Sequence, residues 1–377
     1  MTKRQVCHAE SGLVLTATAA ADKLAPGNRR EGIEVKAVFD PAQLAHAPRQ
    51  FLVSGAWKPH PETPERAEIL LGAVGRLGLE VEAPPDRGLD PIAAVHDPRY
   101  LTFLQNIYPR WRRIPGAPEE AVPNVHPVAR PGEAVGGYPD SAVGQVGYHV
   151  ADGAAPINGE TWTSAYASAQ SAIHAAHLVL EGAPAAYALC RPPGHHAARD
   201  LAGGFCFLNG SAIAAQLLRG RYDRVTVLDV DVHHGNGTQQ IFYGRDDVLT
   251  VSLHADPVRF YPFFWGHATE TGTGAGEGYN LNLPLERGTA DEAYLEALEG
   301  ALTRIAEFSP GALVLALGLD AHESDPFQGL AITTAGFGRI AGRIAELGLP
   351  CVIVQEGGYV SAELGENLEA ALAGYSA

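Results

Sequence analysis

The chain has 377 residues, of which 46% are hydrophobic and 19% charged, so it can bury a large core and is not a disordered polymer. Its formal charge of −16 argues against nucleic acid, whose binding requires a basic surface. Cys7, Cys190, Cys206 and Cys351 show no CxxC spacing, which indicates free thiols in a reducing compartment. No segment approaches the length of a membrane span, so we expect a cytoplasmic protein without a membrane partner.

Residues 1–34 have mixed charge and are expected to form a poorly structured extension, followed by a single domain over 35–377. The segment SGLVLTATAAA superficially suggests a signal peptide, but it is short and follows His8 and Glu10. Residues from about 109 to 140 are rich in Pro and Gly, and we predict a loop insertion there. Such a loop forms a lid, a rim of the site or an oligomer contact, or else a disordered surface excursion.

From residue 160 onward, apolar runs alternate with helical patterns. We predict helices over 160–182, 209–220, 291–308, 334–348 and 363–375, and strands over 185–190, 225–232, 248–254, 312–320 and 351–359. Continuous apolar strands that alternate with helices predict an α/β fold, an open and mostly parallel sheet with helices on both faces. In such sheets the functional crevice lies outside the carboxyl ends of the strands.

Polar clusters follow these strands. The richest is VTVLDVDVHHGNG, in which an extended backbone would project Asp229, Asp231 and His233 to one side. Two carboxylates and an imidazole at the end of a hydrophobic strand are costly unless a cation pairs with them. Asp320, from another strand end, completes a three-donor set that leaves a position open for water and substrate, as in catalytic metal sites. A strand-end aspartate can instead cap the following helix.

Two further clusters carry acid–base chemistry. His195 and His196 follow a rigid Pro-Pro-Gly turn, and one of them could take a proton from water and then protonate a leaving amine. Asp229 and Asn236 are candidate partners for their second ring nitrogens. Tyr359 follows Gly357-Gly358 and could donate a hydrogen bond to a developing oxyanion. Each of these aromatic residues could also be an ordinary core side chain.

The motifs RPPGHH, GGFCFLNG, LDVDVHHGNGT, VSLHADP, LGLDAHESDP and EGGY closely resemble the histone deacetylase superfamily, in particular its bacterial branch with the acetylpolyamine amidohydrolases. HPETPERAEIL (60–70) and HDPRYLTFLQ (96–105) fit the N-terminal part of that family. The resemblance runs from about residue 37 to the end. It implies an arginase/deacetylase-type fold and a zinc-dependent amidohydrolase.

On this resemblance Asp231, His233 and Asp320 match the zinc ligands, one Zn²⁺ per chain. His196 matches the general base and acid, and His195 matches its electrostatic partner. Tyr359 matches the residue that polarises the acyl carbonyl. Asp229 and Asn236 match the residues that bond the two histidines. Gly204, Phe205 and Tyr261 match the rim and walls of the acyl tunnel. A structural K⁺ would use Asp229, Asp231 and Ser252 with the carbonyls of His233 and Leu253, and a second monovalent ion would use carbonyls near Phe242, Arg245 and Val248.

Departures from the family pattern concern the substrate. Val143 and Ala154 match positions that are acidic in acetylpolyamine enzymes. His149 matches the substrate-orienting aspartate of many histone deacetylases. Phe327 stands where a polyamine-selective branch has a gatekeeper glutamate. An apolar gate does not favour a buried cation. The Pro-rich loop, with Tyr108 and Trp111, resembles the insertion that narrows the mouth and helps to form dimers or tetramers in the family.

We therefore predict a zinc-dependent hydrolase of N-acylated primary amines, such as acetylpolyamines, other small acetylated amines or acetyl-lysine, which releases acetate and a free amine. The alternatives are a protein acyl-lysine deacetylase, a hydrolase of neutral xenobiotic amides or esters, an arginase-like binuclear manganese enzyme, and a non-catalytic binder of acyl-amines. Iron or cobalt could replace zinc, because an N/O donor set discriminates weakly among these metals.

Overall fold

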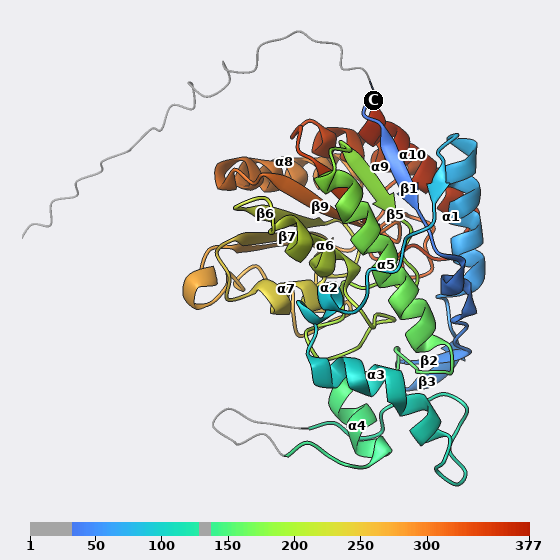
Figure 1. Cartoon of the computed structure of the whole chain (residues 1–377). Helices are drawn as coiled ribbons and strands as arrows, with labels where there is room; N and C mark the ends of the chain where they lie inside the picture. Colours follow the sequence, from blue (N-terminus) through green and yellow to red (C-terminus); the bar gives the residue numbers. More distant parts are fainter. Residues whose placement is uncertain (1–31, 128–136) are drawn as a thin grey trace, which may run out of the picture. The chain divides into compact units, whose positions relative to one another are not determined.

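The computed structural model describes residues 32–127 and 137–377, so nearly all of the predicted extension at 1–34 lies outside the described residues. At the centre is a sheet of eight strands in the order β4-β1-β5-β10-β9-β6-β7-β8, with every pairing parallel (Figure 1). The strands are β1 (Val35–Val38), β4 (Val81–Glu82), β5 (Ala185–Ala188), β6 (Val225–Asp229), β7 (Val248–Ala255), β8 (Asn280–Leu285), β9 (Ala312–Leu317) and β10 (Cys351–Gln355). This sheet confirms the predicted α/β class.

Helices cover both faces of the sheet, and each face has its own hydrophobic core. One core includes side chains of α1 (Pro64–Arg76), α8 (Asp291–Phe308), α9 (Thr334–Ala345) and α10 (Leu364–Ser376). The other includes side chains of α3 (Pro98–Trp111), α5 (Thr161–Leu180), α6 (Gly210–Leu218) and α7 (Asn236–Phe242). Every residue of β5, β6, β7, β9 and β10 is buried, which explains why these strands read as continuous apolar runs rather than alternating patterns.

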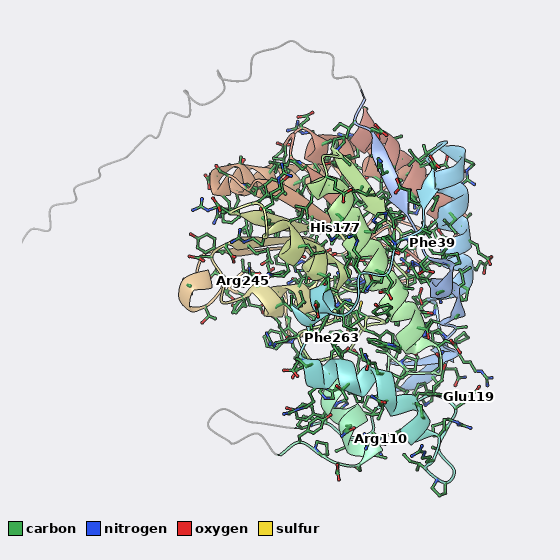
Figure 2. All side chains as sticks on the ribbon, in the orientation of Figure 1. Phe39, Arg110, Glu119, His177, Arg245 and Phe263 are labelled. Carbon is green, nitrogen blue, oxygen red and sulfur yellow. The ribbon has the colours of Figure 1, made fainter. Side chains whose placement is uncertain are left out.

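Smaller elements lie at the carboxyl edge of the sheet. The antiparallel hairpin of β2 (Gln50–Val53) and β3 (Ala56–Pro59), together with α3 and α4 (Ala142–His149), lies below this edge in Figure 1. The remaining short helices are η1 (Pro41–Ala45), α2 (Asp90–Ala93) and η2 (Gly274–Gly276). Arg110 of α3, labelled in Figure 2, donates through Nη2 to the carbonyl of Asp140 at 2.6 Å and so holds the segment that precedes α4.

The predicted loop insertion at 109–140 begins slightly later than expected, because α3 continues through Pro109 to Trp111. Beyond it, Ala121 pairs with Ile157 in an isolated bridge, and residues 128–136 lie outside the described part. Among the helices in the described ranges, none is long and apolar enough to cross a membrane.

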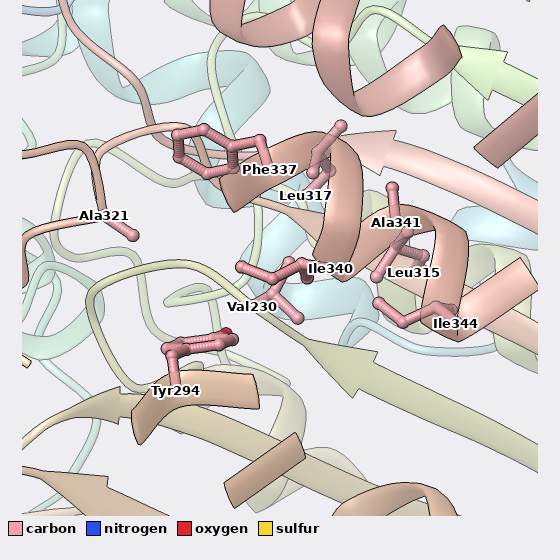
Figure 3. Close-up of a pocket in the computed structure, with 9 residues that line it drawn as sticks. All are labelled: Val230, Tyr294, Leu315, Leu317, Ala321, Phe337, Ile340, Ala341 and Ile344. Atoms are coloured by element: carbon pink, nitrogen blue, oxygen red, sulfur yellow. The ribbon is translucent and has the colours of Figure 1, made fainter. Parts of the chain in front are cut away.

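One cavity lies inside the first core. Its lining comes from β9, α8 and α9 and the neighbouring loops: Val230, Tyr294, Leu315, Leu317, Ala321, Phe337, Ile340, Ala341 and Ile344 (Figure 3). Apart from the hydroxyl of Tyr294, these side chains are hydrocarbon. The cavity therefore belongs to the packing between helix and sheet, and the polar chemistry lies elsewhere.

Candidate active site

The sheet order gathers the polar clusters predicted from the sequence. Strands β5, β10, β9, β6 and β7 are consecutive neighbours, and their carboxyl ends lie along one edge. Each strand is followed by a predicted site residue. His195 and His196 follow β5, and Tyr359 follows β10. Asp320 follows β9, Asp231 and His233 follow β6, and Tyr261 follows β7. Because parallel strands end at the same edge, residues separated by up to 164 positions in sequence (195 to 359) meet in one crevice.

Asp231, His233 and Asp320 converge so that one donor atom of each lies within 4.8 Å of the other two. Nδ1 of His233 is 3.1 Å from Oδ1 of Asp231 and 3.1 Å from Oδ2 of Asp320. The opposite oxygens are fixed by backbone donors. Gly357 N donates to Oδ2 of Asp231 at 2.7 Å, and Val232 N donates to Oδ1 of Asp320 at 3.0 Å. The three remaining donors therefore face a common point.

Two glycines make room for these carboxylates. A Cβ on Gly357 would lie 2.1 Å from Oδ2 of Asp320, and one on Gly318 would lie 2.3 Å from Oδ2 of Asp231. Contacts this short would displace the donors, so any side chain at either position disrupts the cluster.

The donor chemistry fits a divalent metal. All three residues are buried, and two carboxylates with one imidazole form the open three-ligand set of catalytic sites. Burial alone would lower the pKa of His233, but its hydrogen bonds to Asp231 and Asp320 raise that pKa to about 9. The protein thus favours a positive charge at this point, which a proton or a metal ion can supply.

The strand itself is shorter than the sequence suggested. β6 ends at Asp229, so Asp231 and His233 do not continue an extended strand as expected. Instead, Asp229 Oδ1 accepts a hydrogen bond from Asp231 N at 3.0 Å, and Asp231 Oδ1 accepts one from His233 N at 2.8 Å. Successive aspartates hold the following backbone, and this turn aims the ligand candidates.

His195 and His196 have different partners although their rings lie only 4.1 Å apart, centroid to centroid. Nδ1 of His195 is 2.9 Å from Oδ2 of Asp229, and Nδ1 of His196 is 2.7 Å from Oδ1 of Asn236. Burial opposes protonation of both rings. For His195 the carboxylates of Asp231 and Asp229 outweigh burial and raise the pKa to about 10.

For His196, burial and the positive charges of His195 and His233 lower the pKa well below its usual value. The partner of His196 is a neutral amide, which compensates only weakly. His196 is therefore unprotonated near neutral pH and can accept a proton. Its neighbour is a cation under the same conditions, so the pair divides into a base and an acid.

Tyr359 closes the opposite side of the crevice. Its ring lies 4.9 Å from Phe327 and 5.7 Å from Phe205, centroid to centroid, and the guanidinium carbon of Arg66 is 5.5 Å from its centroid. Burial and the charge of Asp320 raise the pKa of Tyr359 well above its usual value. The phenol therefore keeps its proton and can act as a hydrogen-bond donor.

The pocket walls are aromatic. Gly204 and Phe205 both adopt positive φ, +52° and +71°, and a Cβ on Gly204 would lie 2.5 Å from the His196 ring. Tyr261 packs edge-on against His196 with the centroids 4.9 Å apart. Of the predicted wall residues, Gly204, Phe205, Tyr261 and Phe327 are brought together. Phe51, from the β2–β3 hairpin, joins Phe205 and Tyr359 in a small cluster that was not expected.

His149 is not brought to this pocket. Its Nδ1 bonds the carbonyl of Asp200 at 2.7 Å, its Nε2 bonds the hydroxyl of Tyr138 at 3.1 Å, and its ring packs among Tyr100 and Phe103. Tyr100 and Phe103 belong to the second core, so this side chain faces that core rather than the crevice. The predicted substrate-binding role of His149 therefore has no geometric support.

Asp152, three residues later, lies beside two of the pocket walls. Oδ2 of Asp152 accepts a hydrogen bond from the Tyr261 hydroxyl at 2.7 Å, and its two oxygens lie 3.3 and 3.4 Å from Gly204 N. Its neighbours are thus two of the pocket walls, and the side chain is only partly buried. Val143 packs on the second core, and Ala154 packs beside Phe205 and Tyr359. The sequence HVADG (149–153) contains Asp152, but no role was predicted for this carboxylate.

A buried charge cluster supports the Tyr359 segment and was also missed. Glu62 lies 2.8 Å from Nε of Arg191 and 3.4 Å from Nη1 of Arg66. Arg66 also donates to the carbonyls of Gly358 and Glu356. The sequence HPETPER contains this pair, with Glu62 two residues before α1 and Arg66 in its first turn.

A second group of possible metal ligands, His195, Cys206 and Glu356, is already committed to other bonds. Both oxygens of Glu356 accept hydrogen bonds, Oε1 from the Ser211 hydroxyl at 2.6 Å and Oε2 from Gly194 N and His195 N at 2.7 and 3.0 Å. Burial raises the pKa of the Cys206 thiol well above its usual value. These three residues are therefore poorly suited to bind the second metal ion that an arginase-like enzyme requires.

The monovalent-ion residues lie behind the metal cluster. Asp229 of β6 is the register partner of Ser252 of β7, and both line a small polar cavity with His234, Thr238, Gln239, Asn280 and Asn282. Leu253 follows Ser252 on β7, and β7 runs beside the segment that carries Asp231 and His233. The cavity is lined mainly by oxygen-bearing side chains, which suits a cation held by neutral donors and one carboxylate.

Comparison with known proteins agrees with this geometry. The model of the histone deacetylase domain matches residues 60–375. An acetylpolyamine amidohydrolase of Burkholderia pseudomallei is 48% identical over 340 residues, covering 90% of this chain and 98% of that protein. Acetylpolyamine amidohydrolase 1 of Pseudomonas aeruginosa is 44% identical with the same coverage. The crystal structure of the Burkholderia acetylpolyamine aminohydrolase superimposes with a TM-score of 0.87 at 47% identity, covering 91% of this chain and 99% of that one.

Proposed function

The chain belongs to the histone deacetylase family and is an amidohydrolase, and on that premise we propose that it hydrolyses N-acetylated polyamines and related small acetylated amines. The products are acetate and the free amine. The observation that carries the proposal is the division of roles at one sheet edge: three converging metal donors, one unprotonated histidine, one protonated histidine and a protonated tyrosine.

We propose that Asp231, His233 and Asp320 hold one zinc ion per chain. The ion would polarise the acyl carbonyl and promote ionisation of the attacking water. His196 accepts the proton of the water through the ring nitrogen that does not face Asn236. Tyr359 donates its phenolic hydrogen to the carbonyl oxygen as negative charge develops there. A histidine of the pair then delivers a proton to the departing nitrogen, for which the cationic His195 and the newly protonated His196 are both placed.

The polyamine preference rests on Asp152 and on the relatives, which are named as acetylpolyamine enzymes. The sequence alone argued for an apolar mouth, because Val143, Ala154 and Phe327 replace acidic residues. Asp152 adds a partly exposed carboxylate beside Tyr261 and Gly204, within reach of a distal ammonium group. An ion pair of this kind is more favourable at a partly buried site than at an open surface.

The test compares kcat/KM for acetylated diamines, acetyl-lysine peptides and neutral N-alkyl acetamides in wild type and Asp152→Asn. We expect acetylated diamines to exceed neutral amides, and Asp152→Asn to reduce this preference by about tenfold, since one lost ion pair is worth ~1–2 kcal/mol. The neutral amides serve as the internal control, because they have no ammonium to lose. Equal kcat/KM for diamines and neutral amides in the wild type would contradict the polyamine assignment.

A monovalent-cation requirement is a second part of the proposal. We propose that K⁺ binds near Asp229 and Ser252, in contact with the segment of Asp231 and His233, and that another ion binds among the carbonyls near Phe242, Arg245 and Val248. The polar cavity behind the metal donors supports the first of these sites. We also propose a dimer or tetramer, which the resemblance of the loop at about 109–140 to the family insertion supports.

A further inference from the structure

Asp325 links the two segments that form one side of the crevice. It is buried, 2% exposed, in the loop that follows β9. Its Oδ1 accepts a hydrogen bond from Phe327 N at 2.9 Å, and its Oδ2 accepts one from Tyr359 N at 3.1 Å. One carboxylate therefore binds the backbone of a pocket wall and the backbone of the tyrosine that faces the metal donors.

No cation neutralises this carboxylate within the described ranges, where the ion pairs within 4.0 Å do not include Asp325. The charged groups that face it are Asp320 on its own segment and His233 after β6, while Arg66 lies over the ring of Tyr359. Burial and the charge of Asp320 raise the pKa of Asp325 to about 7. A buried acid without a cationic partner is costly, so its two backbone bonds are its main compensation.

The Tyr359 backbone needs such an anchor. Two glycines precede it, and Gly358 adopts a φ of +116°, which other residues rarely adopt, so no side chain at these two positions helps to fix the backbone. Gly357 N is held by Asp231 and the Gly358 carbonyl by Arg66. The N–H of Tyr359 is the next donor along the chain, and Asp325 accepts it.

We propose that Asp325 is a positioning residue: through the backbone N–H of Tyr359 it holds the phenol toward the reacting carbonyl, and through Phe327 N it keeps that ring packed on the same tyrosine. The inference rests on the proposed function, since it assigns Tyr359 to the reaction. The ring centroids of Phe327 and Tyr359 lie 4.9 Å apart, so a shift of either backbone segment moves the phenol.

The first variant is Asp325→Asn, tested in the full chain. The amide keeps one acceptor oxygen but turns an NH₂ group toward the second backbone N–H, so one of the two anchors is lost. We expect kcat on an acetylated diamine to fall by about tenfold to a hundredfold with KM within about threefold, because the phenol stabilises charge that develops only in the transition state. An unchanged kcat would overturn the proposal.

A double-mutant cycle with Tyr359→Phe distinguishes a positioning role of Asp325 from a general disturbance of the active site. If Asp325 acts through the phenol, Asp325→Asn lowers kcat in the wild-type background but by less than about twofold in the Tyr359→Phe background. Full additivity, with the same fold-loss in both backgrounds, would overturn the proposal. If Asp325→Asn does not fold, the cycle is run with Asp325→Glu, which keeps both oxygens on a chain one methylene longer.

Asp291→Asn is the matched control. Asp291 also accepts bonds from a loop, from Thr333 N at 2.9 Å and the Thr333 hydroxyl at 2.6 Å, but it lies at the start of α8, outside the crevice. We expect it to lower the thermal midpoint with kcat unchanged. Metal content is measured for every variant. A wild type without amidohydrolase activity would overturn the proposed function itself, whereas an active wild type with an additive cycle overturns the role of Asp325 alone.

Discussion

Asn236 leaves His196 without a carboxylate partner on its Nδ1. The carboxylates of Asp231 and Asp229 raise the pKa of His195, whereas burial and the charges of His195 and His233 lower the pKa of His196, and the neutral amide of Asn236 opposes this only weakly. A base whose pKa is depressed stays competent at neutral pH and loses activity only as the pH falls through that low pKa. We therefore expect the acidic limb of kcat/KM in the wild type to lie well below neutral pH, set by the lowered pKa of His196.

Replacing Asn236 by Asp should move this acidic limb to higher pH. A carboxylate 2.7 Å from Nδ1 stabilises the imidazolium and raises the pKa of His196 by about 1–3 units. The measurement is the pH profile of kcat/KM for Asn236→Asp, with Asn236→Ala as the control that removes the partner without adding charge. An acidic limb of Asn236→Asp that coincides with that of the wild type would contradict the assignment of His196 as the base.

Among the elements, helix α8 carries an unpaired group into the core. The hydroxyl of Tyr294 is buried and has no hydrogen-bond partner among residues 32–127 and 137–377, and it borders the apolar cavity between α8, α9 and β9 (Figure 3). A buried donor left unsatisfied costs about 1–3 kcal/mol relative to a bonded one.

We expect Tyr294→Phe to raise the free energy of unfolding by about 1 kcal/mol, because the desolvated hydroxyl is removed while the ring still fills the space. Chemical denaturation of both proteins measures the change. The turnover of an acetylated diamine serves as the control and should not change, since α8 contributes no group to the crevice. A loss of stability on this substitution would mean that the hydroxyl has a bonding partner, such as a trapped water.

The elements that the sequence predicted well are those with long apolar patterns. The helix predicted over 291–308 forms over Asp291–Phe308, and the strand predicted over 248–254 forms over Val248–Ala255. β1, β4 and β8 were not predicted, because β4 has only two residues and the polar residues within β1 and β8 interrupt the continuous apolar run that marked the other strands. β6 was predicted too long, since the apolar pattern runs on past Asp229 while the backbone turns to satisfy the aspartates.

At the scale of the whole molecule, the candidate site was largely predictable because its reactive groups follow strand ends. Asp152, Asp325 and Glu356 were missed for one shared reason. Each accepts a backbone hydrogen bond from a residue distant in sequence, Gly204, Tyr359 and His195 respectively, and a sequence does not show which donors lie nearby. His149 was matched to a substrate-orienting aspartate of the family, whereas the carboxylate of this segment that contacts the pocket walls is Asp152.

Metal removal tests the site as a unit. We expect a chelator to abolish turnover and to lower the thermal midpoint, since Asp231 and Asp320 then repel one another. The pKa of about 9 for His233 means that a proton competes with the metal at neutral pH. The apparent zinc affinity should therefore rise about tenfold per pH unit up to about pH 9. Competition with a chelating dye at several pH values measures this slope, and a flat profile would argue against His233 as a ligand.

The position of β10 has a consequence for how the molecule is made. This strand is the last in the sequence, yet it lies in the middle of the sheet between β5 and β9. During synthesis the edges of β5 and β9 that later pair with β10 stay unpaired until residues 351–355 leave the ribosome. Unpaired strand edges can pair with those of other chains. We expect chains that end before Cys351 to aggregate, which sedimentation of truncated products would show. Folding of the complete sheet thus waits for almost the entire chain.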